Sequence, residues 1–226
     1  MNHREVFGNP EQSIRRRTNE YRDPLRGETV KKQSLEYYNT ITGGLVGKCE
    51  LNERFNETTG GLVGKYKLNE RFNETTGGLV EKYELNERFD QTTGWLVGKY
   101  KLNERFNETT GGLVERGICN QYVDDSNCWF TKEQNEKLNS ENLWEKTYRT
   151  VRFTNIGGTD KWIDAKTFEI LNPDTNQCRK IRASEEIWYT ETGTTETHNY
   201  IGDEQGSQWV EETTNQNQDR TGCVIT

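Results

Sequence analysis

Tyrosine and arginine recur at intervals of seventeen residues in the first half of the chain. A tyrosine ring can stack on an apolar or sugar surface, and an arginine guanidinium can hold a carboxylate or phosphate with two parallel hydrogen bonds. At a constant interval, such groups would form a multivalent surface on which weak contacts add up. We therefore predict a ligand-binding face formed by Tyr66, Tyr83, Tyr100, Arg54, Arg71, Arg88 and Arg105.

The sequence shows no grouping of residues that is typical of catalysis or of metal binding. Its two histidines, His3 and His198, are far apart, and no glycine-rich phosphate loop follows a strand and opens a helix. The five cysteines are widely spaced and include no Cys-x-x-Cys pair, so neither a zinc site nor a disulfide framework is indicated. We predict that the protein is not an enzyme and uses no cofactor or metal.

The spacing of the tyrosines and arginines comes from an internal repeat with the consensus GGLVGKYKLNERFNETT. Its first glycines are Gly43, Gly60, Gly77, Gly94 and Gly111. Four units are complete, the fifth breaks off after Glu115, and a divergent half-unit, Leu35–Thr42, precedes the first. Divergent terminal units are typical of capping repeats, which must present a polar outer face.

Apolar and polar residues alternate within each unit, which is the pattern of a β-strand. In the second unit, Leu62, Tyr66, Leu68 and Phe72 share one parity, whereas Lys65, Lys67, Asn69 and Arg71 share the other. Thr75–Gly78 predicts a glycine turn, and Asn69-Glu70 a weaker one. Each unit is thus expected to form a strand of about eight residues, a short turn, a strand of about five and a glycine turn.

Tryptophan is concentrated after the repeats, at Trp129, Trp144, Trp162, Trp188 and Trp209, with Trp95 inside the repeats. Thr147–Ile156 and Lys161–Leu171 alternate and end in turn residues, which predicts strands, whereas Lys132–Lys146 is a candidate helix. Trp95, Trp188 and Trp209 are candidate stacking platforms for sugar rings; burial in a core is the alternative role for such residues.

The predicted fold is therefore mainly β, with a repeat-built antiparallel β-meander or extended sheet followed by a second, tryptophan-rich β region. The expected division is a polar N-terminal extension at residues 1–33, the seventeen-residue repeats at 34–116, the tryptophan-rich region at 117–210 and a polar tail at 211–226.

Charge and hydropathy restrict the partners and the location. The net charge is −7, and Ser184–Thr226 contains nine acidic residues and one basic residue. Nucleic acid is not an expected partner, because proteins that bind it normally carry a basic excess. The sequence shows no secretory signal and no apolar stretch approaching the roughly 20 residues of a membrane span, so a cytoplasmic location is expected.

Two short segments of the repeat resemble strands of the cyanovirin-type lectin family. The family pattern L-x-A-x-C, followed by L-N-(D/E)-x-aliphatic, a loop and G-x-L-V, is similar to Leu45–Cys49 and to Leu51–Phe55 continuing to Gly61–Val63. The loop between the two family strands is absent here, and only the first unit has a cysteine, Cys49. The resemblance implies a non-catalytic, carbohydrate-binding β-fold.

Two binding functions are compatible with these patterns, and a disordered linker is the third interpretation. The first is a non-enzymatic binding or scaffold protein that presents equivalent sites to a polymeric or periodic ligand, either a polysaccharide or a protein filament. The alternative is a lectin that uses tyrosine and tryptophan as stacking platforms. Near-identical units also arise from recent duplication alone, so the repeat does not by itself identify the ligand.

The last four residues, Cys223-Val224-Ile225-Thr226, have the C-a-a-X form of a prenylation site, although threonine is not a usual final residue. No polybasic stretch adjoins them, and the acidic tail would be repelled by an anionic leaflet. Chance occurrence of the motif is the alternative. A prenylated Cys223 would make the protein a peripheral membrane protein.

Replacing Cys223 tests this motif. In a eukaryotic host, Cys223→Ser should move part of the protein from the membrane fraction to the soluble fraction, and mass spectrometry should detect an isoprenoid on the wild type. The shift should be partial, because one lipid chain without basic residues binds membranes only marginally. Identical fractionation of the two proteins, with an unmodified Cys223, would remove the membrane hypothesis and leave the repeat hypothesis intact.

Overall fold

The computed structural model describes residues 12–123, 128–156, 159–171, 178–202 and 210–217. These residues form thirteen β-strands and no helix, and the strands follow the order of the sequence. The prediction of a mainly β, antiparallel meander is confirmed. The chain divides into two compact units, residues 1–116 and 117–226, and the division falls at the predicted end of the repeats.

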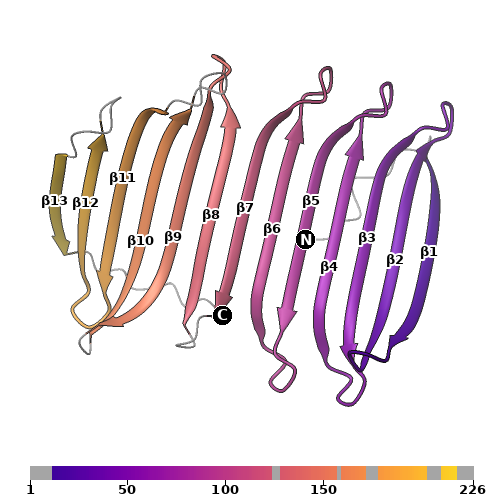
Figure 1. The fold of residues 1–226 in the computed structure, drawn as a ribbon, viewed down its shortest axis with the longest axis horizontal. Coiled ribbons are helices and arrows are strands. Elements are labelled where there is room, and N and C mark those ends of the chain that lie inside the picture. Colours follow the sequence, from indigo (N-terminus) through magenta and orange to yellow (C-terminus); the bar gives the residue numbers. More distant parts are fainter. Residues whose placement is uncertain (1–11, 124–127, 157–158, 172–177, 203–209, 218–226) are drawn as a thin grey trace. The chain divides into compact units, whose positions relative to one another are not determined.

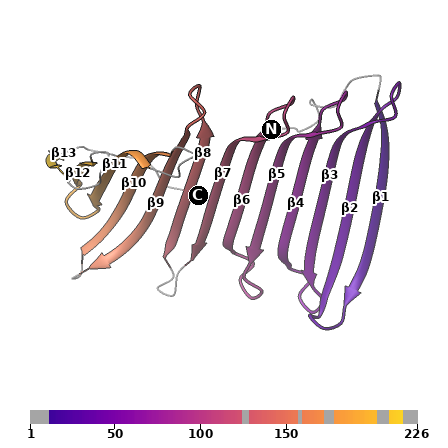
Figure 2. The same cartoon turned by 45° about the horizontal axis from the view of Figure 1, so that its top comes forward.

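The first unit contains the repeats. Its strands are β1 (Gln12–Asp23), β2 (Glu28–Asn39), β3 (Leu45–Asn56), β4 (Leu62–Phe72), β5 (Leu79–Phe89), β6 (Leu96–Phe106) and the first residues of β7 (Leu113–Val123). Strands β1 to β6 lie side by side in one layer (Figures 1 and 2). Within this unit, side chains are therefore buried mainly against residues of neighbouring strands.

Each repeat unit forms one long strand, and the prediction of two strands with a turn at Asn69-Glu70 is wrong. Both residues lie inside β4, where Asn69 pairs with Tyr83 and Glu70 with Lys82. Neither residue has a positive φ, and the turn would break the continuous ladder between the strands. The glycine turn is the only chain reversal in each complete unit that the structure describes.

The loops between units share one set of hydrogen bonds, shown here for Asn73–Gly78. Asn73 N–H donates to the Gly78 carbonyl at 2.8 Å, and Gly77 N–H donates to the Asn73 carbonyl at 2.8 Å. The Asn73 side-chain oxygen accepts from the N–H groups of Thr75 and Thr76. Gly77 has a φ of 70°, a conformation that glycine adopts without steric cost. The Asn-x-Thr-Thr-Gly sequence therefore fixes the register of each hairpin.

Each repeat strand also has a β-bulge just after its loop, and a valine is the extra residue. In β5, Glu81 pairs with Arg71 and Leu79 with Phe72, which leaves Val80 between the two pairs. Val46, Val63 and Val97 occupy the same place in the other units. Val46, Val63 and Val80 have exposed fractions of only 4%, 4% and 2%. Val46, Val63 and Val80 are therefore among the best-buried side chains of this single layer.

β-strands extend beyond both predicted ends of the repeat region. Residues 12–33, expected to belong to a polar extension, form β1 and the first half of β2. The unit that breaks off after Glu115 continues as a full strand to Val123. These segments lack the repeat motif, but strand pairing needs only backbone groups, and β1 pairs with β2 along its whole length.

The second unit contains the rest of β7, β8 (Trp129–Leu138), β9 (Trp144–Ile156), β10 (Thr159–Leu171), β11 (Cys178–Tyr189), β12 (Thr194–Gly202) and β13 (Val210–Asn217). The strands predicted at Thr147–Ile156 and Lys161–Leu171 are confirmed as parts of β9 and β10. Strand β13 also includes residues 211–217, which were expected to belong to a polar tail.

The helix predicted at Lys132–Lys146 is wrong, because this segment forms a hairpin between β8 and β9. Glu136 pairs with Lys146 across the strands, and their side chains form an ion pair of 3.0 Å. At the turn, the Asn139 side chain accepts hydrogen bonds from the N–H groups of Glu141 and Leu143, and Asn142 has a φ of 58°. Turn chemistry and cross-strand pairing outweigh the helix propensity of the glutamates and lysines.

The bulge valines give a test of the fold. Val80→Ala should lower the free energy of unfolding by about 2 kcal/mol, because two buried methyl groups are lost and the site cannot fully collapse. Val97→Ala is the matched control, since Val97 has the same place in its unit but is only half-buried. Urea unfolding followed by circular dichroism measures both, and equal losses would contradict this account of burial.

Candidate binding faces of the repeat sheet

Equivalent residues of consecutive units lie on opposite faces of the sheet. Directly paired residues share a face, and Tyr66 pairs with Asn86 whereas Tyr83 pairs with Asn69. Since the unit has seventeen residues, an odd number, and forms one strand, each residue type changes face from one unit to the next. Tyr66 and Tyr100 share one face, and Tyr83 lies on the other with Cys49.

The predicted tyrosines and arginines therefore form two sets instead of one. The Tyr66 face also carries Arg54 and Arg88, and the Tyr83 face carries Arg71 and Arg105. Equivalent side chains on one face are two strands apart, which is about 9.5 Å at the usual spacing of strands. Of the seven predicted residues, the Tyr66 face thus carries four and the Tyr83 face three.

The two faces differ at the eighth residue of the unit, which is Glu50, Lys67, Glu84 and Lys101 in consecutive units. Because each unit changes face, both glutamates lie on the Tyr66 face and both lysines on the Tyr83 face. The chemical repeat is therefore two units long. Sequence reasoning missed this alternation, although the letters themselves show it once one strand is assigned to each unit.

The Tyr66 face is electrically balanced over β3 to β6. It carries four basic residues, Lys48, Arg54, Lys82 and Arg88, and four acidic residues, Glu50, Glu70, Glu84 and Glu104. Lys48 and Lys82 form ion pairs of 2.8 Å with Glu50 and Glu84, and hydrogen bonds to these carboxylates raise the pKa of both lysines. Its lysines are thus neutralised by the eighth-position glutamates.

The arginines of the Tyr66 face lie beside glycines. Arg54 pairs with Gly64, and its Nη2 atom would be 2.6 Å from a Cβ atom added there. Its guanidinium also contacts the buried carboxylate of Glu28 at 3.5 Å. Arg88 lies between Gly64 and Gly98 and forms no ion pair among the described residues. The glycines therefore leave space on the sheet for flat guanidinium groups.

The Tyr83 face has a basic excess of three over β3 to β6. This face carries six basic residues, Lys65, Lys67, Arg71, Lys99, Lys101 and Arg105. It carries three acidic residues, Glu53, Glu81 and Glu87. Arg71 and Arg105 form ion pairs with Glu81 and Glu115 at 3.1 and 2.8 Å. The basic residues of this face are therefore neutralised only in part.

The sixth-position lysines of the Tyr83 face are also paired. Lys65 lies 3.7 Å from Glu53, and Lys99 lies 3.2 Å from Glu87. Lys67 and Lys101, in contrast, form no ion pair among the described residues. They are the unneutralised cations of this face.

Tyr66 and Tyr83 each lie between asparagines of the two adjacent strands, and Tyr100 pairs with Asn86 on β5. Tyr66 pairs with Asn52 and Asn86, and Tyr83 pairs with Asn69 and Asn103. The rings are half-buried. Burial, followed by the charges of Glu84 and Glu50, raises the pKa of Tyr66, so its hydroxyl stays protonated and can donate a hydrogen bond. The tyrosines therefore offer a partly exposed ring and a hydroxyl to a ligand.

The remaining candidate residues are not brought to either face. Trp95 takes the place of the second glycine of a loop, where φ is not positive, and its exposed fraction is 75%. Trp188 lies in the second unit, half-buried opposite Trp162 on the neighbouring strand. Trp209 and Cys223 lie outside the described residues. Trp95 is thus the candidate platform that is open to a ligand.

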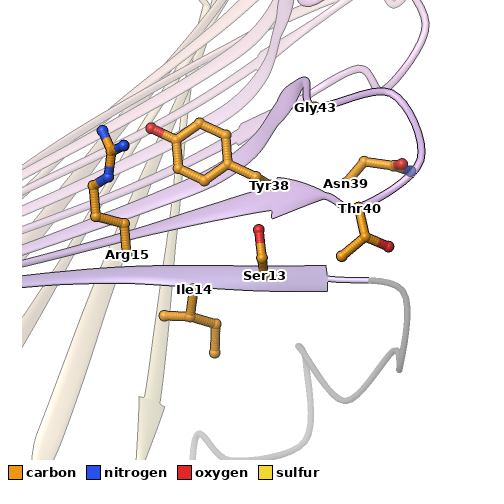
Figure 3. Close-up of a pocket in the computed structure, with 7 residues that line it drawn as sticks. All are labelled: Ser13, Ile14, Arg15, Tyr38, Asn39, Thr40 and Gly43. Carbon is orange, nitrogen blue, oxygen red and sulfur yellow. The ribbon is translucent and has the colours of Figure 1, made fainter.

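A pocket of about 540 Å³ lies at the end of β1 and β2 (Figure 3). It is lined by Ser13, Ile14, Arg15, Tyr38, Asn39, Thr40 and Gly43. Within it the Arg15 guanidinium lies 5.7 Å from the centre of the Tyr38 ring. This lining provides no general base beside Ser13, and the pocket lies at the edge strand β1 and its neighbour β2, outside the rows of β3 to β6.

The described residues contain no group of three His, Cys, Asp or Glu side chains that could hold a metal ion. Nor do they form a helix of the length and apolarity that crossing a membrane requires. Comparison with known proteins identifies no matching family model and no similar curated protein. Function must therefore be inferred from the geometry of the two faces.

The loop that carries Trp95 gives a test by pH. Asp90 takes the place of the loop asparagine, and hydrogen bonds from Thr93, through its N–H and hydroxyl, and from the Thr92 N–H lower the pKa of Asp90. A lowered pKa in the folded state means that Asp90 stabilises the fold above the unfolded-state pKa. This contribution disappears as the pH falls through the folded-state value.

Asp90→Asn is the matched variant, because the other repeat loops have asparagine there. Between about pH 7 and about pH 3, the melting temperature of the wild type should fall more than that of Asp90→Asn. Parallel curves for the two proteins would show that the Asp90 carboxylate makes no net contribution to the loop.

Proposed function

We propose that the repeat sheet is a non-enzymatic binding surface, or scaffold, for a polymeric or periodic ligand. The observation that supports this is the recurrence of the same side chains every second strand on each face, at about 9.5 Å. A polymer that crosses the strands would meet the same groups again at each step. Contacts that are weak one by one would then give useful avidity.

The shape of the faces favours an extended ligand over a small molecule. Small-molecule sites are concave and enclose most of the ligand. Strands β3 to β6 instead form one layer (Figure 2), and their tyrosines, Lys67 and Lys101 lie half-buried on its two faces. On such a surface a single sugar or ion would bury little area, whereas a chain can contact several strands at once.

A lectin is the second candidate function. It is favoured by Trp95, whose indole is 75% exposed, and by the half-buried tyrosines, since sugar rings stack on aromatic surfaces. A glycan array and co-sedimentation with cellulose, chitin and F-actin would separate a carbohydrate ligand from a protein filament. Tyr66→Ala/Tyr83→Ala/Tyr100→Ala should abolish saturable glycan binding if the protein is a lectin.

The multivalent part of the proposal is tested by changing the number of units. Deleting residues 60–93 removes two whole units, joins equivalent loops and keeps every later residue on its original face. The variant should fold, because the new neighbours present equivalent edges. Its apparent affinity for the polymer identified above should fall by on the order of tenfold or more, because avidity depends on the number of sites.

Circular dichroism of this deletion variant and of one lacking eight residues of a unit controls for folding. The shorter deletion should unfold the sheet, because it destroys a strand and its loop. A folded two-unit deletion that binds as tightly as the wild type would contradict multivalent binding. Unfolding of both deletions to the same extent would contradict the assignment of the units.

A further inference from the structure

We propose that the Tyr83 face is the binding face and that its ligand is a linear, anionic polysaccharide whose carboxylate or sulfate groups bind Lys67 and Lys101. This inference rests on the proposed function, because it assigns the ligand class to that same repeat surface. The starting observation is the eighth residue of the unit, which is glutamate on the Tyr66 face and lysine on the Tyr83 face.

The unneutralised charge of the Tyr83 face is periodic. The other basic residues of β4 and β6 on this face have carboxylate partners, at distances from 2.8 to 3.7 Å. Lys67 and Lys101 have none among the described residues, and they lie two strands apart, about 9.5 Å. On the Tyr66 face, the equivalent positions are Glu50 and Glu84, which neutralise lysines. Only the Tyr83 face thus presents a row of unneutralised lysines.

The neighbours of these lysines suit a sugar chain. Across the strands, Leu51, Lys67, Leu85 and Lys101 form a straight row in which each lysine lies beside leucine. Tyr83 lies in the next row and is diagonal to both lysines, because it pairs with Asn69 and Asn103. Diagonal neighbours on a sheet face are within reach of long side chains. A ligand along the row would therefore meet charge, apolar surface and an aromatic ring in turn.

Other polyanions fit this face less well. An acidic peptide needs partners for its own N–H and C=O groups, which a sheet supplies along an edge strand and not across a face. Nucleic acid binding relies on a large basic excess and on arginine forks. Here the excess is three, and Arg71 and Arg105 are already paired with glutamates. A polysaccharide has no backbone amides, and carboxylates or sulfates can each accept hydrogen bonds from one lysine.

The test compares two pairs of substitutions that change the net charge equally. Lys67→Gln/Lys101→Gln removes the lysine row from the Tyr83 face. Lys48→Gln/Lys82→Gln is the control, since these lysines are also two strands apart but lie on the Tyr66 face. Binding of the full chain to alginate, heparin and neutral dextran is measured by affinity electrophoresis at low and at physiological salt, with circular dichroism to confirm folding.

We expect the wild type to bind alginate or heparin, more weakly at the higher salt, and to bind dextran much less. Lys67→Gln/Lys101→Gln should lower the affinity for the polyanion by about tenfold or more, since two charge-assisted contacts are lost. The control pair should bind within a few-fold of the wild type. Lys67→Arg/Lys101→Arg should retain binding, because it conserves the charges. The stronger of the two polyanions identifies carboxylate or sulfate as the preferred group.

Two outcomes would overturn this inference and leave the proposed function standing. One is normal polymer binding by the folded Lys67→Gln/Lys101→Gln protein. The other is an equal loss in both pairs, which would mean that total charge and not the Tyr83 face determines binding. Wild-type protein that binds none of the polysaccharides or F-actin would instead overturn the proposed function, and the inference with it.

Discussion

Pairing between neighbouring strands is the interaction on which the repeat region depends. Within the first unit the strands form one layer, so strand side chains are buried mainly by their own strand and its direct neighbours. The buried apolar residues of the repeat units are three of the bulge valines, Val46, Val63 and Val80, and two leucines, Leu68 and Leu102. No described side chain reaches complete burial. Register must therefore be exact, because a shift by one residue would exchange the two faces of a strand and separate Leu68 from its partners Glu50 and Glu84.

The loops and bulges maintain that register together. The Asn-x-Thr-Thr-Gly loop, with Asp90 in place of asparagine in one unit, joins one strand to the next with the same backbone hydrogen bonds. The bulge at the valine then shifts the later pairs by one residue. Because unit length and loop geometry are constant, a residue changes face with every unit. Because the repeat has an odd length, consecutive units present equivalent residues on opposite faces of the sheet. Substitutions that recur every second unit therefore change the charge of one face only.

The all-β fold and the strands in both halves could be predicted from alternation and turn residues. The single strand per unit could not be, because Asn69-Glu70 resembles a turn until its pairing with Tyr83 and Lys82 is known. Nor could the hairpin at Lys132–Lys146, where helix-forming residues are held extended by cross-strand ion pairing. The tyrosines and arginines were predicted as candidate binding residues from their spacing. Their division between two faces could not be predicted, because it depends on how many strands each unit forms. Lys67 and Lys101 were missed for the same reason.

The distribution of charge also bears on why a polymer is a better partner than a compact protein. A stable protein–protein interface buries a packed apolar centre with few unpaired charges. The Tyr83 face instead alternates lysine with leucine along its central row and has no broad apolar patch over β3 to β6. A flat partner would have to desolvate every lysine at once, including those that pair with glutamates. A thin anionic chain along the row can neutralise Lys67 and Lys101 while the surrounding ion pairs remain in water, so the cost of desolvation is confined to the two groups that gain a new partner.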